Sequence, residues 1–313
     1  MATASVDPQP PLRSAVFVYA GEGAGMRSML SALDALKGAL PAATVATITP
    51  EEVVGGAWAA TAALLVMPGG ADLPYCSALG GAGNAAIARY VREGGRYLGL
   101  CAGGYYGCAR VDFEPGNRGM AVAGPRELAF FPGAAVGAAV PGFQYGSEAG
   151  AAAVGLTWRR IGAPPPGGGG GREGVGPWRA VRDYCNGGPV FARLDGRAWE
   201  GDGGGMVTVI ARYASMGEAT PPAAAATSPA PAAAALGVVA ALRVVVGRGA
   251  AVLCGTHPEL APAAAWLGGD GDVASASLAA ELDASAADRA AYWAALLEAA
   301  GVERLMGKGR VEK

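Results

Sequence analysis

Histidine is almost absent from this chain, because only one occurs among its 313 residues. The five cysteines form no Cys-x-x-Cys pair and stand at positions 76, 101, 108, 185 and 254. Zinc sites need several Cys or His ligands, so we expect no metal site and no cofactor. Free thiols fit a reducing compartment, and we expect the cytoplasm, with organelle targeting by the N-terminal MATASVDPQPPLRS left open.

Charge of one sign and long apolar runs are lacking as well. The chain has 24 Lys and Arg against 26 Asp and Glu, a formal net charge of -2, and no long basic block. Nucleic-acid binding would need such a basic footprint, so we expect none. No uninterrupted apolar run approaches the roughly 20 residues that span a bilayer, so we expect no membrane segment. A small-molecule or protein partner fits better.

Glycine, by contrast, is abundant: the chain has 52, far above the usual share of about 7%. Much of the chain is therefore expected to be loop. We expect one α/β domain over 14–306, preceded by a flexible N-terminus at 1–13 and followed by a basic tail at 307–313. Two low-complexity stretches, 161–176 and 217–235, are too poor in patterned apolar residues to offset their ordering entropy and are expected to be insertions.

Strands and helices are predicted to alternate along the first third of the chain. Apolar runs that end in glycines predict strands at 14–25, 61–70 and 96–104. Apolar residues at helical spacing predict helices at 26–40 and 84–95. Each predicted strand is apolar throughout, which is typical of a parallel sheet covered on both faces.

Further elements are predicted in the second half. Residues 206–214 have the pattern of a strand, and 242–246 and 250–254 are expected to form a hairpin around Gly247-Arg248-Gly249. The stretch 287–306 predicts a closing amphipathic helix.

Cys101 lies in YLGLCAGGYYG, straight after a short apolar stretch. A nucleophile on a sharp strand-to-helix turn needs small neighbours because the backbone is crowded there, and Gly-Leu-Cys-Ala-Gly has the spacing of G-x-S-x-G with Cys in place of Ser. A buried structural cysteine is an equal alternative in so glycine-rich a chain. The other four cysteines are expected to be structural.

The only histidine lies in CGTHPEL, just after the predicted strand 250–254. Pro258 favours an extended His257, and residues two apart in an extended segment face the same way, so Glu259 is expected beside the imidazole, or turned toward it by a local bend. Thiol, imidazole and carboxylate would form a nucleophile, base and orienter set. A lone His before Pro on a loop is the alternative for this motif taken by itself.

Several stretches together resemble a known family. GLCAGG with THPE is similar to class I glutamine amidotransferases and related flavodoxin-like proteins. More narrowly, the chain resembles the amidotransferase-like domain at the N-terminus of fungal biotin-protein ligases and its free-standing relatives. The resemblance covers most of 14–262 apart from the insertions, and its longest match is 61–116. It is carried by MPGGADLPYC, YVREGGRYLGLCAGGYYG, RVDFEPG, YCNGGPVF and CGTHPEL.

The resemblance implies a flavodoxin-like, doubly wound, mostly parallel sheet with flanking helices. It also implies Cys101 as nucleophile, His257 as base and Glu259 as orienting acid. Backbone N–H groups near Gly70 and of Ala102 would form the oxyanion hole.

Other polar and aromatic residues in these stretches are candidates for the pocket wall. Glu22 is a second carboxylate candidate near the thiol, ranked below Glu259 because another branch of the superfamily assigns its acid differently. For each remaining candidate a packing or turn role is at least as good an interpretation; these are Asp72, Tyr75, Tyr105, Tyr106, Glu114, Tyr184 and Asn186.

The chain departs from a complete biotin-protein ligase. Nothing after residue 262 is long enough for the ligase catalytic domain, with its arginine-glycine loop and lysine-tryptophan-proline motif. We therefore expect a glutamine amidotransferase-like protein that hydrolyses a small amide substrate through a thioester, with a ligase or synthetase as protein partner. Two alternatives stay open: a non-catalytic binding or regulatory module of a ligase or carboxylase system, and a redox sensor at Cys101.

Overall fold

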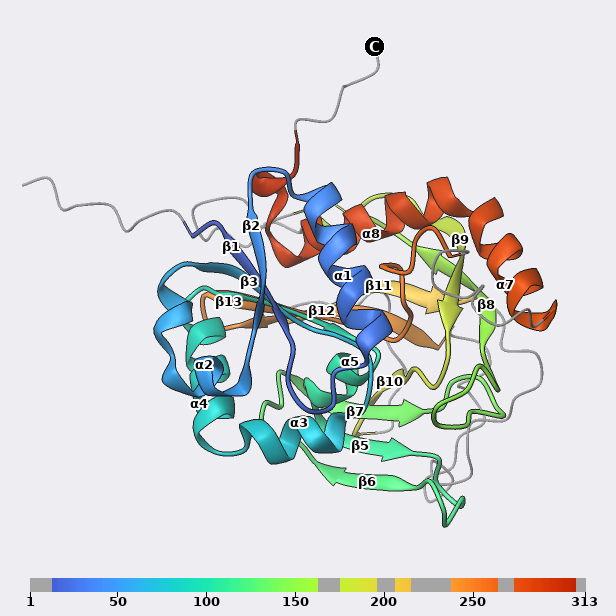
Figure 1. The fold of residues 1–313 in the computed structure, drawn as a ribbon, viewed down its shortest axis with the longest axis horizontal. Helices are drawn as coiled ribbons and strands as arrows, with labels where there is room; N and C mark the ends of the chain where they lie inside the picture. Colours follow the sequence, from blue (N-terminus) through green and yellow to red (C-terminus); the bar gives the residue numbers. More distant parts are fainter. Residues whose placement is uncertain (1–12, 163–174, 196–205, 215–237, 264–272, 308–313) are drawn as a thin grey trace, which may run out of the picture.

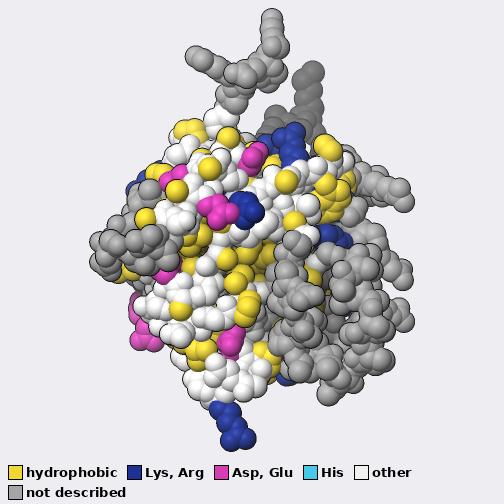
Figure 2. Space-filling model, turned by 90° about the vertical axis from the view of Figure 1, so that its right-hand side faces the viewer, with side chains coloured by type: hydrophobic (Ala, Val, Ile, Leu, Met, Phe, Trp, Pro, Cys, Tyr) yellow, Lys and Arg dark blue, Asp and Glu magenta, His cyan; other side chains and the backbone are white. Residues whose placement is uncertain are grey.

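A computed structural model describes residues 13–162, 175–195, 206–214, 238–263 and 273–307 (Figure 1). Four segments singled out in the sequence lie wholly or largely outside these ranges: 1–13, 161–176, 217–235 and 307–313. Within the described ranges, none of the helices is long and apolar enough to cross a membrane. On the face seen in Figure 2, basic and acidic side chains are scattered among apolar ones rather than gathered by sign.

Five parallel strands form one half of a 13-stranded sheet, in the order β2-β1-β3-β4-β13. Numbered along the chain within this half alone, the order is 2-1-3-4-5, which is the flavodoxin-like arrangement. The predicted α/β fold class is therefore confirmed. The five strands are β1 (Ala15–Tyr19), β2 (Thr44–Ile48), β3 (Ala62–Met67), β4 (Arg96–Leu100) and β13 (Gly249–Cys254).

Helices cover both faces of this half because its strands are apolar on both sides. In β1, Val16 and Val18 belong to one core cluster, whereas Phe17 and Tyr19 pack in another. The first cluster includes side chains of α1 (Met26–Ala39) and α8 (Ala286–Ala300). The second includes side chains of the helices on the opposite face (Figure 1), namely α2 (Pro50–Gly55), η1 (Ala57–Ala60), α3 (Asp72–Leu79), α4 (Ala82–Arg92) and α5 (Ala102–Tyr106).

The other half of the sheet is largely antiparallel. It begins with the predicted hairpin, in which β12 (Val239–Val246) pairs with β13. Among the described strands of this half, β5 and β7 are the one parallel pair. An apolar run does not reveal the direction of its neighbour, so most of this half was not predicted. Its further strands are β5 (Cys108–Phe113), β6 (Val122–Pro125), β7 (Phe131–Gly137), β8 (Ala152–Trp158), β9 (Arg179–Cys185), β10 (Val190–Arg193) and β11 (Val207–Tyr213).

The closing region is helical, as its sequence pattern indicates. α7 (Val273–Ala284) contacts β8 and β9, and α8 contacts β4, β9 and β13. A short 3-10 turn, η4 (Glu303–Leu305), follows α8. The helix predicted over 287–306 is thus confirmed up to Ala300, and the end of the predicted stretch forms a separate 3-10 turn.

The turn from β4 into α5 is packed tightly against β3. A Cβ added to Gly99 would overlap the carbonyl oxygen of Gly103, and a Cβ on Gly103 would overlap the carbonyl oxygen of Met67. The glycines on both sides of Cys101 are therefore required by close backbone approach. This packing holds the start of α5 beside the carboxyl ends of β3 and β4, where the parallel strands open into loops.

We predict that Gly103→Ala destabilises the protein by on the order of 3 kcal/mol, because the methyl group meets backbone that cannot yield without moving β3. Gly38→Ala is the control: Gly38 lies in α1 with open space around its Cα, so Ala should stabilise by up to about 1 kcal/mol. Denaturant unfolding checks both. Equal effects of the two substitutions would contradict the packing described here.

Candidate active site

Cys101 lies at the sharp turn between β4 and α5. Its backbone has φ 47° and ψ −103°, a left-handed φ that residues with a Cβ rarely adopt. The turn is held on both sides: the Cys101 N–H donates to the Cys254 carbonyl at 2.8 Å, and the Tyr105 N–H donates to the Cys101 carbonyl at 3.0 Å. A strained strand-to-helix turn of this kind presents a side chain at the edge of the sheet.

The four other cysteines lie in different surroundings. Burial raises the pKa of Cys185 and of Cys254 to about 12 and raises that of Cys108 well above 9.0. Burial also raises the pKa of the half-buried Cys76. Since the thiolate is the nucleophile, these four side chains are poor candidates for covalent chemistry.

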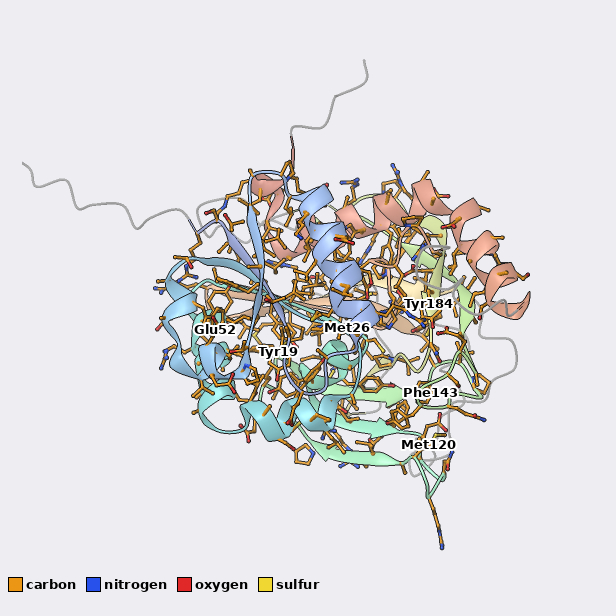
Figure 3. All side chains as sticks on the ribbon, in the orientation of Figure 1. Tyr19, Met26, Glu52, Met120, Phe143 and Tyr184 are labelled. Carbon is orange, nitrogen blue, oxygen red and sulfur yellow. The ribbon has the colours of Figure 1, made fainter. Side chains whose placement is uncertain are left out.

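His257 follows β13, the strand that pairs with β4. Its N–H donates to the Tyr184 carbonyl at 2.9 Å, and the Tyr184 ring lies edge-on to the imidazole at 5.7 Å (Figure 3 labels Tyr184). The His257 carbonyl accepts a hydrogen bond from Nη2 of Arg289 at 3.0 Å. Arg289 is fully buried and pairs with the buried Asp183 at 2.9 Å, so α8 and β9 together fix the histidine backbone.

Glu259 orients the imidazole from the buried side. A local turn at Pro258 brings its Oε1 to 2.7 Å from Nδ1 of His257. The same oxygen accepts a hydrogen bond from Oγ of Ser28 at 2.8 Å, and the Gly69 N–H donates to that hydroxyl at 2.8 Å. A carboxylate with no exposed surface needs such partners, and here they tie α1 and the loop after β3 to the imidazole.

The charges of Cys101 and Glu259 both act on the pKa of His257. Burial lowers the pKa of His257, but the negative charges of Glu259 and of a Cys101 thiolate raise it by more, helped by side-chain hydrogen bonds to both groups. The pKa of His257 therefore lies well above its ordinary value of 6.5. The predicted contact between His257 and Glu259 is present, and the charge of Cys101 acts on the same imidazole.

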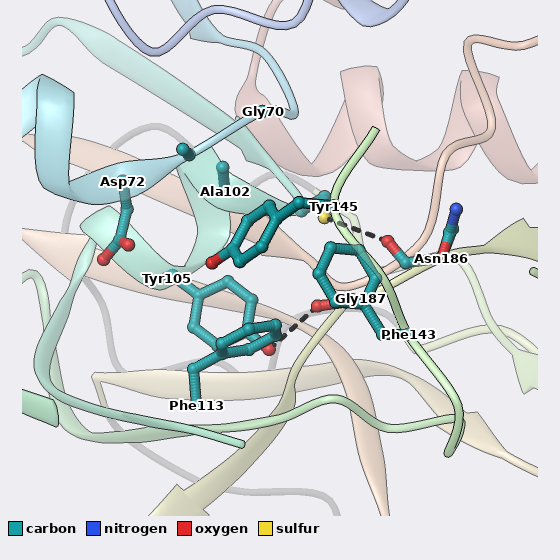
Figure 4. A pocket seen from close by; sticks show the side chains of 11 residues that line it. Gly70, Asp72, Ala102, Tyr105, Phe113, Phe143, Tyr145, Asn186 and Gly187 are labelled. Carbon is teal, nitrogen blue, oxygen red and sulfur yellow. Dashed lines mark hydrogen bonds between the residues drawn. The ribbon is translucent and has the colours of Figure 1, made fainter. Parts of the chain in front are cut away.

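A narrow cavity of about 40 Å³ opens beside the Cys101 thiol (Figure 4). Gly70 and Ala102 line it, and among the described residues no hydrogen bond uses the backbone N–H of either. The thiol donates to the Asn186 carbonyl at 3.9 Å, and the Tyr105 hydroxyl donates to the Gly187 carbonyl at 3.0 Å. The cavity is thus bordered by the Cys101 thiol and by two residues, Gly70 and Ala102, whose backbone N–H groups make no hydrogen bond within the described residues.

The structure places three of the candidate wall residues around this cavity, namely Asp72, Tyr105 and Asn186. The other candidates do not line it. Tyr75 and Tyr106 are buried in the core, where their hydroxyls bond to Pro68 and Asn84. The two rings also pack against each other, with their centroids 5.5 Å apart.

Three more candidates lie outside the cavity. Glu22 is exposed in the loop after β1. Glu114 accepts a hydrogen bond from the Ala138 N–H at 3.2 Å, and Tyr184 donates to Glu148 at 2.6 Å. Tyr184 still belongs to the site, since its backbone and ring hold His257.

Several residues of the site carried no recognisable sequence signal. Ser28 lies on the inner face of an ordinary amphipathic helix, and Arg289 lies in the closing helix. Phe113, Phe143 and Tyr145 supply most of the aromatic wall, and the last two lie between β7 and β8 (Figure 3 labels Phe143). Only their aromatic character in a glycine-rich stretch could have suggested them.

A family model described as "Biotin-protein ligase, N terminal" matches residues 14–310. The biotin–protein ligase of Schizosaccharomyces pombe is 33% identical over 245 residues, which is 78% of this chain and 33% of that protein. An uncharacterized protein of Chlamydia muridarum is 52% identical over 100 residues, 32% of this chain and 38% of that protein. The chain spans about a third of the length of the curated relatives it matches.

Two solved structures are similar at lower identity. A chain from a structure described as PurLQS from Thermotoga maritima is 12% identical with a TM-score of 0.43, covering 91% of this chain and 98% of that one. A structure described as a glutamine amidotransferase is 18% identical with a TM-score of 0.42, covering 79% of this chain and 91% of that one.

His257 is the only histidine, so its ring resonances can be followed by NMR without assignment by mutation. We predict a midpoint well above pH 6.5 in the unmodified protein. Glu259→Gln removes the carboxylate charge that favours the imidazolium, so the midpoint should move to lower pH. Asp72→Asn, a carboxylate change elsewhere on the cavity, is the control and should move it less. A midpoint unaltered in Glu259→Gln would contradict the pairing.

Proposed function

The chain belongs to the family of biotin-protein ligase N-terminal domains, and from that premise we propose that it is a cysteine-dependent hydrolase of small carboxamides. One observation carries the proposal: the Cys101 thiol lines a cavity, and its charge acts on the pKa of His257, whose Nδ1 is hydrogen-bonded to Glu259. We take residues 14–306 to act as one domain in this reaction.

The first half of the reaction forms a thioester. His257 holds the proton of the Cys101 thiol, and the thiolate attacks the carbonyl carbon of the amide. The N–H groups of Gly70 and Ala102 supply hydrogen bonds to the oxygen that becomes negative. The imidazolium then donates its proton to the amide nitrogen, ammonia leaves as the C–N bond breaks, and the acyl group stays on sulfur.

The second half regenerates the thiol. His257 takes a proton from water, whose oxygen attacks the thioester carbonyl, and the same N–H groups again serve the oxyanion. The C–S bond breaks, the proton on the imidazole returns to sulfur, and a carboxylic acid is released. Throughout, Glu259 accepts a hydrogen bond from Nδ1 of His257, which keeps a proton on that nitrogen. Nε2 is then the ring nitrogen that exchanges the reacting proton.

Ammonia release from simple amides tests this function directly. We predict turnover that Cys101→Ala abolishes and that His257→Ala lowers by about 10²–10⁴-fold, the usual contribution of a general acid–base group. Cys76→Ala is the matched control, because that cysteine is half-buried and lies outside the cavity, and it should leave the rate unchanged. Turnover that persists in Cys101→Ala would exclude the thiol as nucleophile.

A protein partner is a second proposal, favoured by the coverage of the ligase relative. This chain corresponds to 33% of the length of that protein. We propose that it associates with a ligase or synthetase chain. It should co-purify with the unmatched part of such a ligase expressed separately, and Cys101→Ala should retain the complex. Failure to form a complex at micromolar concentrations would argue against the partner while leaving the hydrolase untouched.

A further inference from the structure

The cavity beside Cys101 is the size of an amide group and little more. Its volume of about 40 Å³ exceeds the roughly 10–15 Å³ of such space that a cavity needs to hold a single water molecule. A carboxamide has three heavy atoms. The cavity can therefore take the reacting group, and the rest of a substrate must lie across the residues at its mouth.

The mouth offers no positive charge. Of the eleven residues that line the cavity in the described part of the chain, none is Lys or Arg, and Asp72 is the one carboxylate. Arg126 lies behind Asp72, buried and bound to its carboxylate at 2.7 Å, and is not part of the lining. Arg27, on α1, pairs with Glu148. A substrate carboxylate at the mouth would meet Asp72 and no free cation of the lining.

Four aromatic residues contribute to the remaining wall, beside Asn186 and several small residues. The Phe113 and Phe143 rings meet edge to face at 5.3 Å, and Phe143 and Tyr145 do so at 4.9 Å. Tyr145 is 54% exposed, so its ring is open to a molecule that extends from the cavity (Figure 4). Since the Tyr105 hydroxyl is bound to Gly187, this side presents an apolar surface.

We propose that the site selects primary carboxamides whose substituent is apolar or aromatic and carries no carboxylate. This inference rests on the proposed hydrolase function and narrows its substrate class. Free glutamine, whose amide lies a few bonds from a carboxylate, is a poor substrate of such a site. Tyr145 is the specificity-determining residue, and the pairing of Asp72 with Arg126 leaves no cation to attract a substrate carboxylate.

Turnover of matched amides tests the selectivity. The value of kcat/KM should be at least about tenfold higher for 3-phenylpropanamide than for glutamine. Tyr145→Ala should lower kcat/KM for 3-phenylpropanamide about tenfold more than for acetamide, through KM, because an aromatic contact is worth up to about tenfold in affinity. Trp178→Ala, an exposed aromatic outside the cavity, is the control. A higher kcat/KM for glutamine would overturn the proposed substrate selectivity but would still agree with the proposed hydrolase function.

Aldehydes test the same pocket without turnover. The Cys101 sulfur adds to an aldehyde carbon, and the thiol proton moves to its oxygen, giving a reversible hemithioacetal that protects Cys101 from iodoacetamide. We expect 3-phenylpropanal to protect at a concentration at least about tenfold lower than succinic semialdehyde, with butanal between them. Asp72→Asn should narrow the gap between butanal and succinic semialdehyde.

The outcomes separate the two proposals. If the aldehyde order holds but no amide is turned over, the hydrolase fails and the pocket selectivity stands. If succinic semialdehyde protects as well as butanal does, the pocket does not discriminate against carboxylates, and the inference is wrong whatever the enzyme turns over.

Discussion

The hydrogen-bonded pair of His257 and Glu259 is the interaction on which the site depends. Glu259 has no exposed surface, and a buried carboxylate is costly unless charge and donors surround it. Nδ1 of His257 and Oγ of Ser28 both reach its Oε1. The second buried pair, Arg289 with Asp183, lies directly behind and holds the His257 carbonyl. Helices α1 and α8, the loop after β3 and strand β9 are thus joined through His257 and Glu259.

The sheet topology explains why residues so far apart in the chain meet here. β4 and β13 are parallel neighbours, and Leu100 pairs with Cys254 in their register. The chain therefore leaves both strands at the same edge of the sheet, with Cys101 after one and the His257 segment after the other. The close contacts of Gly99 and Gly103 then hold the turn that carries Cys101 against β3. The loop after β3 therefore brings Gly70 to the same cavity as Cys101. The site is a direct consequence of strand order.

The sequence predicted the parts of this structure that local patterns determine. Apolar runs ending in glycine located β1, β3 and β4, and the single histidine next to Pro and Glu predicted the contact between His257 and Glu259. Contacts between distant segments left no such pattern. Ser28 is indistinguishable from any inward serine of a helix, and Tyr75 and Tyr106 lie in the family-like stretches yet pack in the core. Apart from the β12–β13 hairpin and β11, the antiparallel half was not predicted, because apolar runs carry no strand direction.

The central claim is that the thiol of Cys101 becomes acylated during turnover. Acid quenching of the protein during turnover of a primary carboxamide, followed by mass spectrometry of its peptides, measures this directly. The account predicts an acyl group on the peptide that contains Cys101 and on no other cysteine, released by hydroxylamine as a thioester should be. An acyl group on another residue, or turnover with no acylated peptide at all, would contradict it.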